Sequence, residues 1–264
     1  MQLAEIPDYL RLRVLVENPL EVIRFRKKRR PGEEIVIRFR DGRRLRLRGD
    51  RQDFHIFRSV FLRDEYRLRP YSAAGWKCVI DLGANVGIFS ARAAPLTERL
   101  IAYEPAEENT GRLEENLTGF SNVVSVRSAV SGNASSLRIY APRAERGSGL
   151  YSQYVRDEND PDDFQVVPAV TLEDVFRDHD ISRCDLLKID VEGAEYEILY
   201  ATSDEVLRSI DRIHGEYHNV EPENPGTRIG AFSSYLHGRG FDVEAIPFRK
   251  GENYGMFYAQ RRGV

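Results

Sequence analysis

The chain has 264 residues, of which 41% are hydrophobic and 31% charged, and it contains only two cysteines. This length and apolar content suffice for one full α/β domain with a smaller appendage. Two cysteines exclude a disulfide framework and a thiolate zinc site. Acids and arginines near the N-terminus replace the apolar segment of a signal peptide, and no apolar run is long enough for a membrane span. The sequence therefore predicts a cytoplasmic protein without a membrane span.

The first part of the chain is basic. Residues 1–75 hold 19 Lys/Arg against 11 Asp/Glu, whereas the whole chain has a net charge of −3. A helical pattern ends in the run RKKRR, whose charge suits the C-terminal end of a helix dipole. Apolar residues then alternate on both sides of the pair Asp41-Gly42, which favours a tight hairpin turn, and residues 54–68 have an amphipathic helical pattern. We expect residues 1–70 to form an accessory α+β region of helix, β-hairpin and helix.

The rest of the chain, residues 71–264, has the pattern of a catalytic α/β domain. Strands are predicted at 77–82, 99–103, 123–129, 185–190, 211–216, 241–247 and 255–260. Helices are predicted at 87–94, 106–117, 172–178, 193–199, 203–209 and 226–238. This alternation is typical of a Rossmann-like, seven-stranded, mostly parallel sheet covered on both faces. The last two strands have no helix between them and should form an antiparallel hairpin, while the polar stretch 141–163 predicts a long loop over the site.

The stretch CVIDLGANVGIFS indicates a ligand site after the first strand of this domain. Asp81 ends the strand, and Gly83, Asn85 and Gly87 follow before a helix begins. Glycines at these positions let a ligand approach the main chain at the carboxyl end of the strand. Asn85 replaces the second glycine of a dinucleotide fingerprint, and an acid in this position repels phosphate. The turn instead suits a cationic ligand, such as the amino-acid end of S-adenosylmethionine.

Two further strand ends extend this predicted site. Glu104 follows the next strand about twenty residues later, where a carboxylate can accept hydrogen bonds from both hydroxyls of a ribose. Ser128 and Ala129 end the third strand, and they could meet the edge of an adenine ring. An ordinary structural turn would also explain residues 81–87, and a helix N-terminal charge would explain Glu104, but the pairing of this turn with Glu104 favours the ligand.

At these residues the chain resembles the FkbM-type methyltransferases, which have the class I S-adenosylmethionine-dependent fold. The resemblance rests on VIDLGANVGIFS, YEPAEENTGRLEENL, SNVVSVRSAVSG, VTLEDV, LLKIDVEGAEYEIL and IHGEYHN, in that order, and covers roughly residues 77–220. It implies a seven-stranded sheet, S-adenosylmethionine as methyl donor, and transfer most often to a hydroxyl of a sugar-like or other small metabolite. Ser128 departs from the small, alanine-type residue that many members carry there.

A second group of polar residues is predicted to act on the methyl acceptor. Asp190 and Glu192 follow one strand, while Glu216 and His218 share one face at the end of the next. An alcohol must lose its proton during attack. His218 or Glu216 could take it while Asp190 orients the donor, or Asp190, Glu216 and His218 could hold a divalent cation that lowers the acceptor's pKa. We favour the metal-free arrangement, because three ligands without adjacent spacing are weak evidence for an ion. Glu195 and His214 are expected to be structural.

Two other functions stay open at the level of sequence. A nucleic-acid methyltransferase would use the basic N-terminal region, but the aromatic residues there lie on apolar faces instead of alternating with the arginines. A non-catalytic S-adenosylmethionine-binding module would not need both sets of acids. We therefore expect a small-molecule acceptor and no nucleic acid. The N-terminal region is expected either to cover part of the acceptor pocket or to form a homodimer contact.

Overall fold

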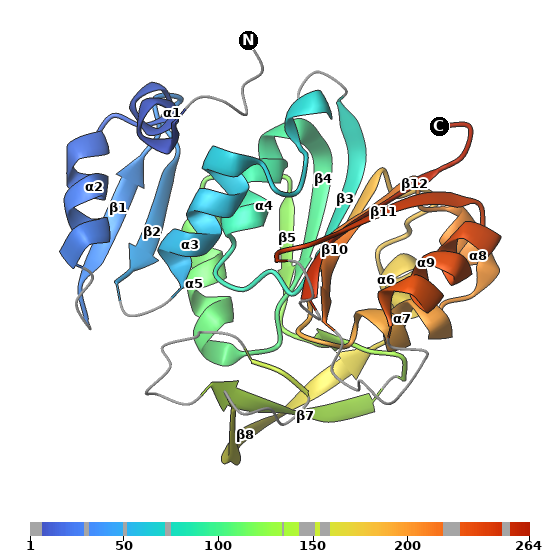
Figure 1. The fold of residues 1–264 in the computed structure, drawn as a ribbon. Coiled ribbons are helices and arrows are strands. Elements are labelled where there is room, and N and C mark those ends of the chain that lie inside the picture. Colours follow the sequence, from blue (N-terminus) through green and yellow to red (C-terminus); the bar gives the residue numbers. More distant parts are fainter. Residues whose placement is uncertain are drawn as a thin grey trace.

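A computed structural model describes residues 7–28, 32–49, 52–71, 75–133, 135–142, 151–153, 159–218, 228–249 and 254–264. These residues form a seven-stranded sheet, two smaller sheets and helices that cover both faces of the large sheet (Figure 1). Across the described ranges, every helix is too short or too polar to cross a bilayer.

The large sheet confirms the predicted fold class. Its strands, in chain order, are β3 (Trp76–Leu82), β4 (Thr97–Tyr103), β5 (Val123–Val126), β9 (Leu186–Ile189), β10 (Arg212–His218), β11 (Phe241–Pro247) and β12 (Tyr254–Arg261). Their spatial order is β11-β12-β10-β9-β3-β4-β5. Strands β5, β4, β3, β9 and β10 run parallel, and β12 is antiparallel to both β10 and β11. The C-terminal hairpin is thus present, with its second strand inserted beside β10.

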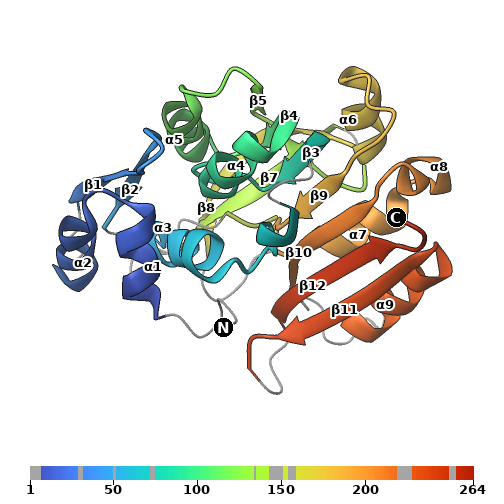
Figure 2. The same ribbon diagram turned by 90° about the horizontal axis from the view of Figure 1, so that it is seen from above.

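Alternate residues of the central strands enter two separate apolar cores, because successive side chains of a strand point to opposite faces. Val79 packs into one core and Ile80 into the other. The first core lies under α4 (Ile88–Ala93) and α5 (Glu107–Leu117). The second lies under α6 (Leu172–Asp178), α7 (Glu195–Ala201), α8 (Asp204–Arg208) and α9 (Ile229–Gly238). Figure 2 shows these two groups of helices on opposite sides of the sheet.

The N-terminal residues pack on the first of these faces. They form α1 (Asp8–Leu15), α2 (Pro19–Lys28), the hairpin β1 (Glu34–Arg38) and β2 (Arg44–Arg48), α3 (Asp53–Phe57), a π-helical turn (Arg58–Arg63) and a short 3-10 turn (Arg69–Tyr71). The hairpin has the predicted register, with Ile37 opposite Leu45. Helix α1 was not predicted, and the predicted helix 54–68 ends at residue 63, because Asp64 takes a left-handed conformation with φ of 58°.

Contacts with the large domain hold this region in place. Phe57 and Phe61 share one apolar core with Phe89 and Leu113. The side chain of Asn116 accepts a hydrogen bond of 2.7 Å from the backbone N–H of Arg46 and donates one of 2.7 Å to the carbonyl of Val86. Docking of the N-terminal residues is therefore a feature of the structure, whereas a domain boundary after residue 70 stays a prediction.

The prediction of a loop at 141–163 is wrong at both ends. Strand β7 (Ser135–Pro142) pairs antiparallel with β8 (Asn159–Val170), and β6 (Ala129–Val130) pairs parallel with β8. This three-stranded sheet lies below the large sheet in Figure 1. Residues 151–153 are described and bridge to β7 through Ser152, while 143–150 and 154–158 lie outside the described residues, as do 226–227 of the last predicted helix.

Candidate active site

A cavity of about 830 Å³ lies along the carboxyl ends of β3, β4, β9 and β10. This size is within the range usual for small-molecule sites, and the carboxyl edge of such a sheet is their usual place. Most residues singled out from the sequence line it: Gly83, Asn85, Glu104, Ser128, Ala129, Asp190, Glu192, Glu216 and His218. Asp81 and Gly87 are not among the residues that line it.

Asp81 lies fully buried beneath the wall of the cavity. Its Oδ2 accepts a hydrogen bond of 2.6 Å from the hydroxyl of Ser90, and its Oδ1 lies 3.0 Å from the ammonium of Lys188. Lys188 is itself buried and donates to the carbonyl of Gly83 at 2.6 Å. The expected contact of Asp81 with a cationic ligand is thus replaced here by Lys188, which the sequence argument overlooked.

The two glycines are required by packing within the chain. Both have positive φ, 75° at Gly83 and 82° at Gly87. A Cβ at Gly83 would lie 1.9 Å from the carbonyl oxygen of Asp190, and a Cβ at Gly87 would lie 2.8 Å from the side chain of Leu113. We predicted these glycines from the approach of a ligand, but the structure shows that neighbouring backbone and side chains already exclude a larger residue.

Glu104 is a buried carboxylate at the end of β4. Its oxygens accept hydrogen bonds from the backbone N–H groups of Asn85 at 2.9 Å and Ala106 at 3.1 Å, and from the amide of Asn109 at 3.2 Å. Burial raises the pKa of Glu104, although these hydrogen bonds oppose the shift. Asn85 has φ of 51°, so the turn after β3 brings its backbone directly onto this acid. The structure therefore brings the turn at residues 81–87 into contact with Glu104, the two features that the sequence paired.

Ser128 and Ala129 line the cavity next to this acid-bearing end. The hydroxyl of Ser128 lies 3.0 Å from the carbonyl oxygen of Pro168 and 3.1 Å from that of Ala129. Its hydrogen is therefore directed to the chain, and only its oxygen can accept a further hydrogen bond.

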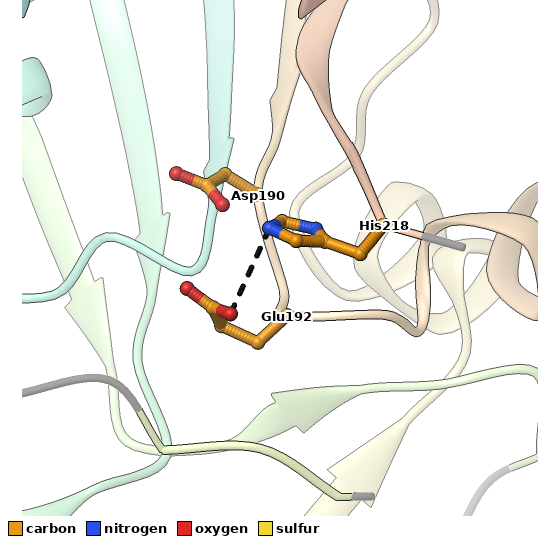
Figure 3. A group of neighbouring side chains, drawn as sticks. All are labelled: Asp190, Glu192 and His218. Carbon is orange, nitrogen blue, oxygen red and sulfur yellow. Dashed lines mark ion pairs between the residues drawn. The ribbon is translucent and has the colours of Figure 1, made fainter. Parts of the chain in front are cut away.

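The predicted acids and histidine gather at the ends of β9 and β10. In Figure 3 the carboxylates of Asp190 and Glu192 and the imidazole of His218 point toward one another. His218 Nε2 lies 3.7 Å from Oε2 of Glu192 and 3.7 Å from Oε2 of Glu216. Asp190, Glu192 and His218 offer ligand atoms within 4.8 Å of one another, a spacing that a divalent cation could use. Glu192 has a left-handed φ of 56°.

Glu195 belongs to this cluster, contrary to the expectation that it only favours a helix N-terminus. It is fully buried, and its Oε1 lies 3.1 Å from Nδ1 of His218 and accepts from the backbone N–H groups of Val191 and Gly193. Burial opposes the charge of His218, but Glu195, Glu192 and Glu216 together raise its pKa from 6.5 to about 10. His218 is therefore a cation at neutral pH.

The pKa of Glu216 is raised as well, which for a carboxyl group favours the uncharged form. Burial and the nearby charge of Asp190 raise the pKa of Glu216 well above its usual range, although His218 counteracts this. A carboxylate with a raised pKa accepts a proton more readily at neutral pH than an ordinary one does.

Tyr66 enters the same site from the N-terminal region. Its phenol donates a hydrogen bond of 2.9 Å to Oδ2 of Asp190. Its carbonyl oxygen lies 2.8 Å from Nδ1 of His214. Burial is the main cause that lowers the pKa of His214 to about 4, so the ring is neutral and donates through Nδ1. His214 therefore has the structural role expected of it, whereas the contact of Tyr66 with Asp190, 124 residues later in the chain, was not predicted from the sequence.

Comparisons with known proteins show the family of this chain. Residues 81–243 match the model of the methyltransferase FkbM domain. The chain is 31% identical to methyltransferase sdnD of Sordaria araneosa over 62% of this chain and 73% of that protein. It is 28% identical to the 31-O-demethyl-FK506 methyltransferase FkbM of Streptomyces tacrolimicus over 72% of this chain and 82% of that protein. A solved methyltransferase FkbM from Methylobacillus flagellatus superposes with a TM-score of 0.48 at 13% identity, covering 70% and 43% of the two chains. The chain belongs to the FkbM methyltransferase family.

Proposed function

We propose that this methyltransferase uses S-adenosylmethionine to methylate a hydroxyl group of a small molecule. When bound, this donor supplies a methyl group on a positively charged sulfur, which an oxygen nucleophile can attack. Two observations support the proposal: the family match, and one continuous cavity that holds Glu104 at one strand end and the cluster of Asp190, Glu216 and His218 at two others. The relative from Streptomyces tacrolimicus is named for transfer to 31-O-demethyl-FK506, which supports oxygen as the acceptor atom.

The residues at the β3 and β4 ends fit this donor. Glu104 lines the cavity as a buried carboxylate and can accept hydrogen bonds from two ribose hydroxyls. The turn from Gly83 to Asn85 presents backbone to the cavity, and Ser128 and Ala129 lie next along the same wall. The acid-rich side of the cavity favours a donor that carries positive charge.

Glu216 is the best candidate to take the acceptor's proton. His218 is protonated at neutral pH because Glu195 and Glu192 surround it, so it has no free lone pair with which to act as a base. Glu216 lines the same cavity, and its raised pKa suits a general base. In this proposal the protonated His218 lies between the carboxylates of Glu192 and Glu216 and stabilises their charges. Asp190, whose carboxylate is held by Tyr66, orients the bound molecules.

The test is methyl transfer from labelled donor into a metabolite extract, combined with calorimetric titration of the donor. Glu216→Gln should lower turnover by roughly a hundredfold or more, the range for losing a general base, and leave donor affinity intact. Glu104→Ala should strongly weaken donor binding, because the ribose would lose its acceptor. Unchanged turnover in Glu216→Gln would remove the base assignment, and unchanged affinity in Glu104→Ala would remove the ribose assignment.

A nucleic-acid acceptor is the alternative, and the arginines of the hairpin argue against it. Arg38 lies 2.9 Å from Glu21, and Arg46 lies 3.0 Å from Glu34. These side chains are engaged within the chain, which leaves fewer charges for phosphates. A gel-shift titration with nucleic acid should detect no complex at low salt that is lost steeply as the salt concentration rises.

A further inference from the structure

The cavity extends beyond the acid cluster to an aromatic pair that the proposed chemistry does not use. Tyr254 begins β12, directly opposite His218 in the antiparallel register, and Phe248 follows β11. Both residues line the cavity. Because the strand order runs β4, β3, β9, β10, β12, β11, the sheet edge passes from Glu104 through the acids to this pair. Four strand spacings separate β4 from β12, a span of roughly 19 Å.

The aromatic pair is half exposed although it is ordered by the fold. Phe248 is 41% exposed and Tyr254 is 44% exposed, with ring centroids 5.5 Å apart. The backbone N–H of Phe248 donates to the carbonyl of Tyr254 at 3.3 Å, which holds the two rings side by side. Ile56 and Val60 line the cavity from the N-terminal region. Aromatic and aliphatic walls with a few convergent polar groups are typical of sites for amphipathic small molecules.

The charge of the reacting position limits the acceptor further. Asp190, Glu192, Glu195 and Glu216 surround His218, and the nearby Lys188 is already paired with Asp81. An anionic group next to the reacting hydroxyl would meet these carboxylates and be repelled.

Two arginines also line the cavity, and both have partners. Arg63 Nη1 lies 3.6 Å from Glu65, and Arg249 has an interaction partner within the protein. The guanidinium of Arg63 is thus engaged by an acid of the chain.

We infer that the acceptor is an uncharged, amphipathic alcohol whose hydroxyl lies at Glu216 and whose apolar ring or chain packs on Phe248 and Tyr254. This inference rests on the proposed function, because it places the acceptor in the same cavity as the donor. Phe248 and Tyr254 are then specificity-determining residues. Alcohols that carry a phosphate or carboxylate next to the reacting hydroxyl are poor acceptors.

Direct binding of three probes tests the inference without knowledge of the natural acceptor. Methyl β-glucoside, octyl β-glucoside below its micelle concentration, and glucose 6-phosphate are titrated by ligand-observed NMR, with and without S-adenosylhomocysteine. The octyl compound should bind at least about tenfold more tightly than the methyl compound, the effect of withdrawing roughly two methylene groups from water. Glucose 6-phosphate should bind more weakly than methyl β-glucoside.

The variants Phe248→Ala and Tyr254→Ala should each reduce the ratio of the affinity for octyl β-glucoside to the affinity for methyl β-glucoside to about two or less. Phe164→Ala is the matched control, because Phe164 is 40% exposed on β8 and is not among the residues that line the cavity. It should keep the full ratio. All three variants should bind the donor as the unmodified protein does, which verifies that they are folded.

Equal affinity for the two glucosides in the unmodified protein would overturn the inference, as would tighter binding of glucose 6-phosphate. An undiminished ratio in both aromatic variants would overturn the assignment to Phe248 and Tyr254. The proposed function is judged separately by donor titration: a protein that binds donor but does not distinguish the glucosides keeps the function and loses this subsite.

Discussion

His218 shows how single residues define the chemistry of this site. Its Nδ1 faces the buried Glu195, and its Nε2 lies between Glu192 and Glu216. From the sequence alone, a histidine at a strand end is predicted to be a base or a metal ligand. The three acids Glu195, Glu192 and Glu216 instead keep it protonated, so it acts as a fixed positive charge. The base role consequently passes to Glu216 in our proposal.

The ion pair of His218 and Glu195 predicts a pH-dependent stability. Because folding raises the pKa of His218 from 6.5 to about 10, its contribution is complete below pH 6.5 and is lost as the pH rises toward 10. The slope between these values is at most about 1.4 kcal/mol per pH unit. Glu195→Gln should lower the free energy of unfolding at pH 7 by about 3 kcal/mol, because it removes the nearest and fully buried partner of the buried His218 charge. Urea denaturation between pH 7 and 10 should show that the free energy of unfolding falls less steeply with pH in the variant than in the unmodified protein. The same dependence on pH in both proteins would contradict the ion pair.

The proton on His218 also bears on whether the enzyme needs a metal ion. A divalent cation bound by Asp190, Glu192 and His218 would have to displace the proton of His218. We expect activity to survive exhaustive chelation and to be unaltered by addition of magnesium, manganese or calcium. Loss of activity on chelation, with recovery on adding back one ion, would make these residues ligands and reverse the metal-free prediction.

Some of these residues carried a sequence signal and some did not. Glu195 precedes Ile198 and Leu199 by three and four positions, which places an acid on the buried face of α7. Lys188 interrupts an otherwise apolar strand. Both patterns indicate buried charges that need partners. The contact of Tyr66 with Asp190 was not predicted, because it depends on how two distant parts of the chain pack.

At the level of elements, the tight approach of the β3 turn to β9 predicts a difference between two glycines. Gly83 and Gly42 both have positive φ, but a Cβ would clash with Asp190 at Gly83 and would meet nothing within 4 Å at Gly42. Gly42→Ala should cost about 1–2 kcal/mol of conformational strain. Gly83→Ala should cost about 4 kcal/mol, because overpacking adds to the strain. Urea denaturation of the two variants measures both losses of unfolding free energy. Equal losses would show that the backbone at Asp190 can shift to accommodate the added Cβ.

The elements that the sequence failed to predict are those stabilised by distant partners. Strand β8 begins in the run NDPDD, whose residues disfavour strands, yet β8 pairs with β7, from Pro142 opposite Asn159 to Ser135 opposite Ala169. The central strands β3 and β4 of the large sheet, by contrast, contain short buried apolar runs, and the parallel strands of this sheet were located from sequence within a few residues. Local pattern therefore sufficed for the buried sheet and not for the smaller one beside it.

For the whole molecule, the N-terminal region is expected to be inseparable from catalysis. Arg67 anchors it as well as Tyr66. The Cζ atom of Arg67 lies 3.5 Å from the ring centre of Tyr258, and its Nη1 lies 2.6 Å from Oε2 of Glu244. After limited proteolysis, the segment before residue 70 should stay associated with the remaining domain through gel filtration. Its rapid loss from folded protein would contradict docking. Tyr66→Phe should lower turnover more than donor affinity, because it frees Asp190 without removing the ring.

The insertion of β12 between β10 and β11 has a consequence for synthesis. A nascent chain that still lacks residues 254–261 holds β10 and β11 without the strand that joins them, and each presents an unpaired edge. The hydroxyl of Tyr258 on β12 also donates a hydrogen bond of 2.6 Å to the carbonyl of Glu65, beside Tyr66. The loop that fixes Asp190 therefore gains the last of its contacts with the sheet only after β12 has been made, whereas the contact of Tyr66 with His214 on β10 can form earlier. On the ribosome this enzyme should pass through a stage with a nearly complete core, an exposed sheet edge and no competent active site, and chaperones that shield strand edges would act at that stage.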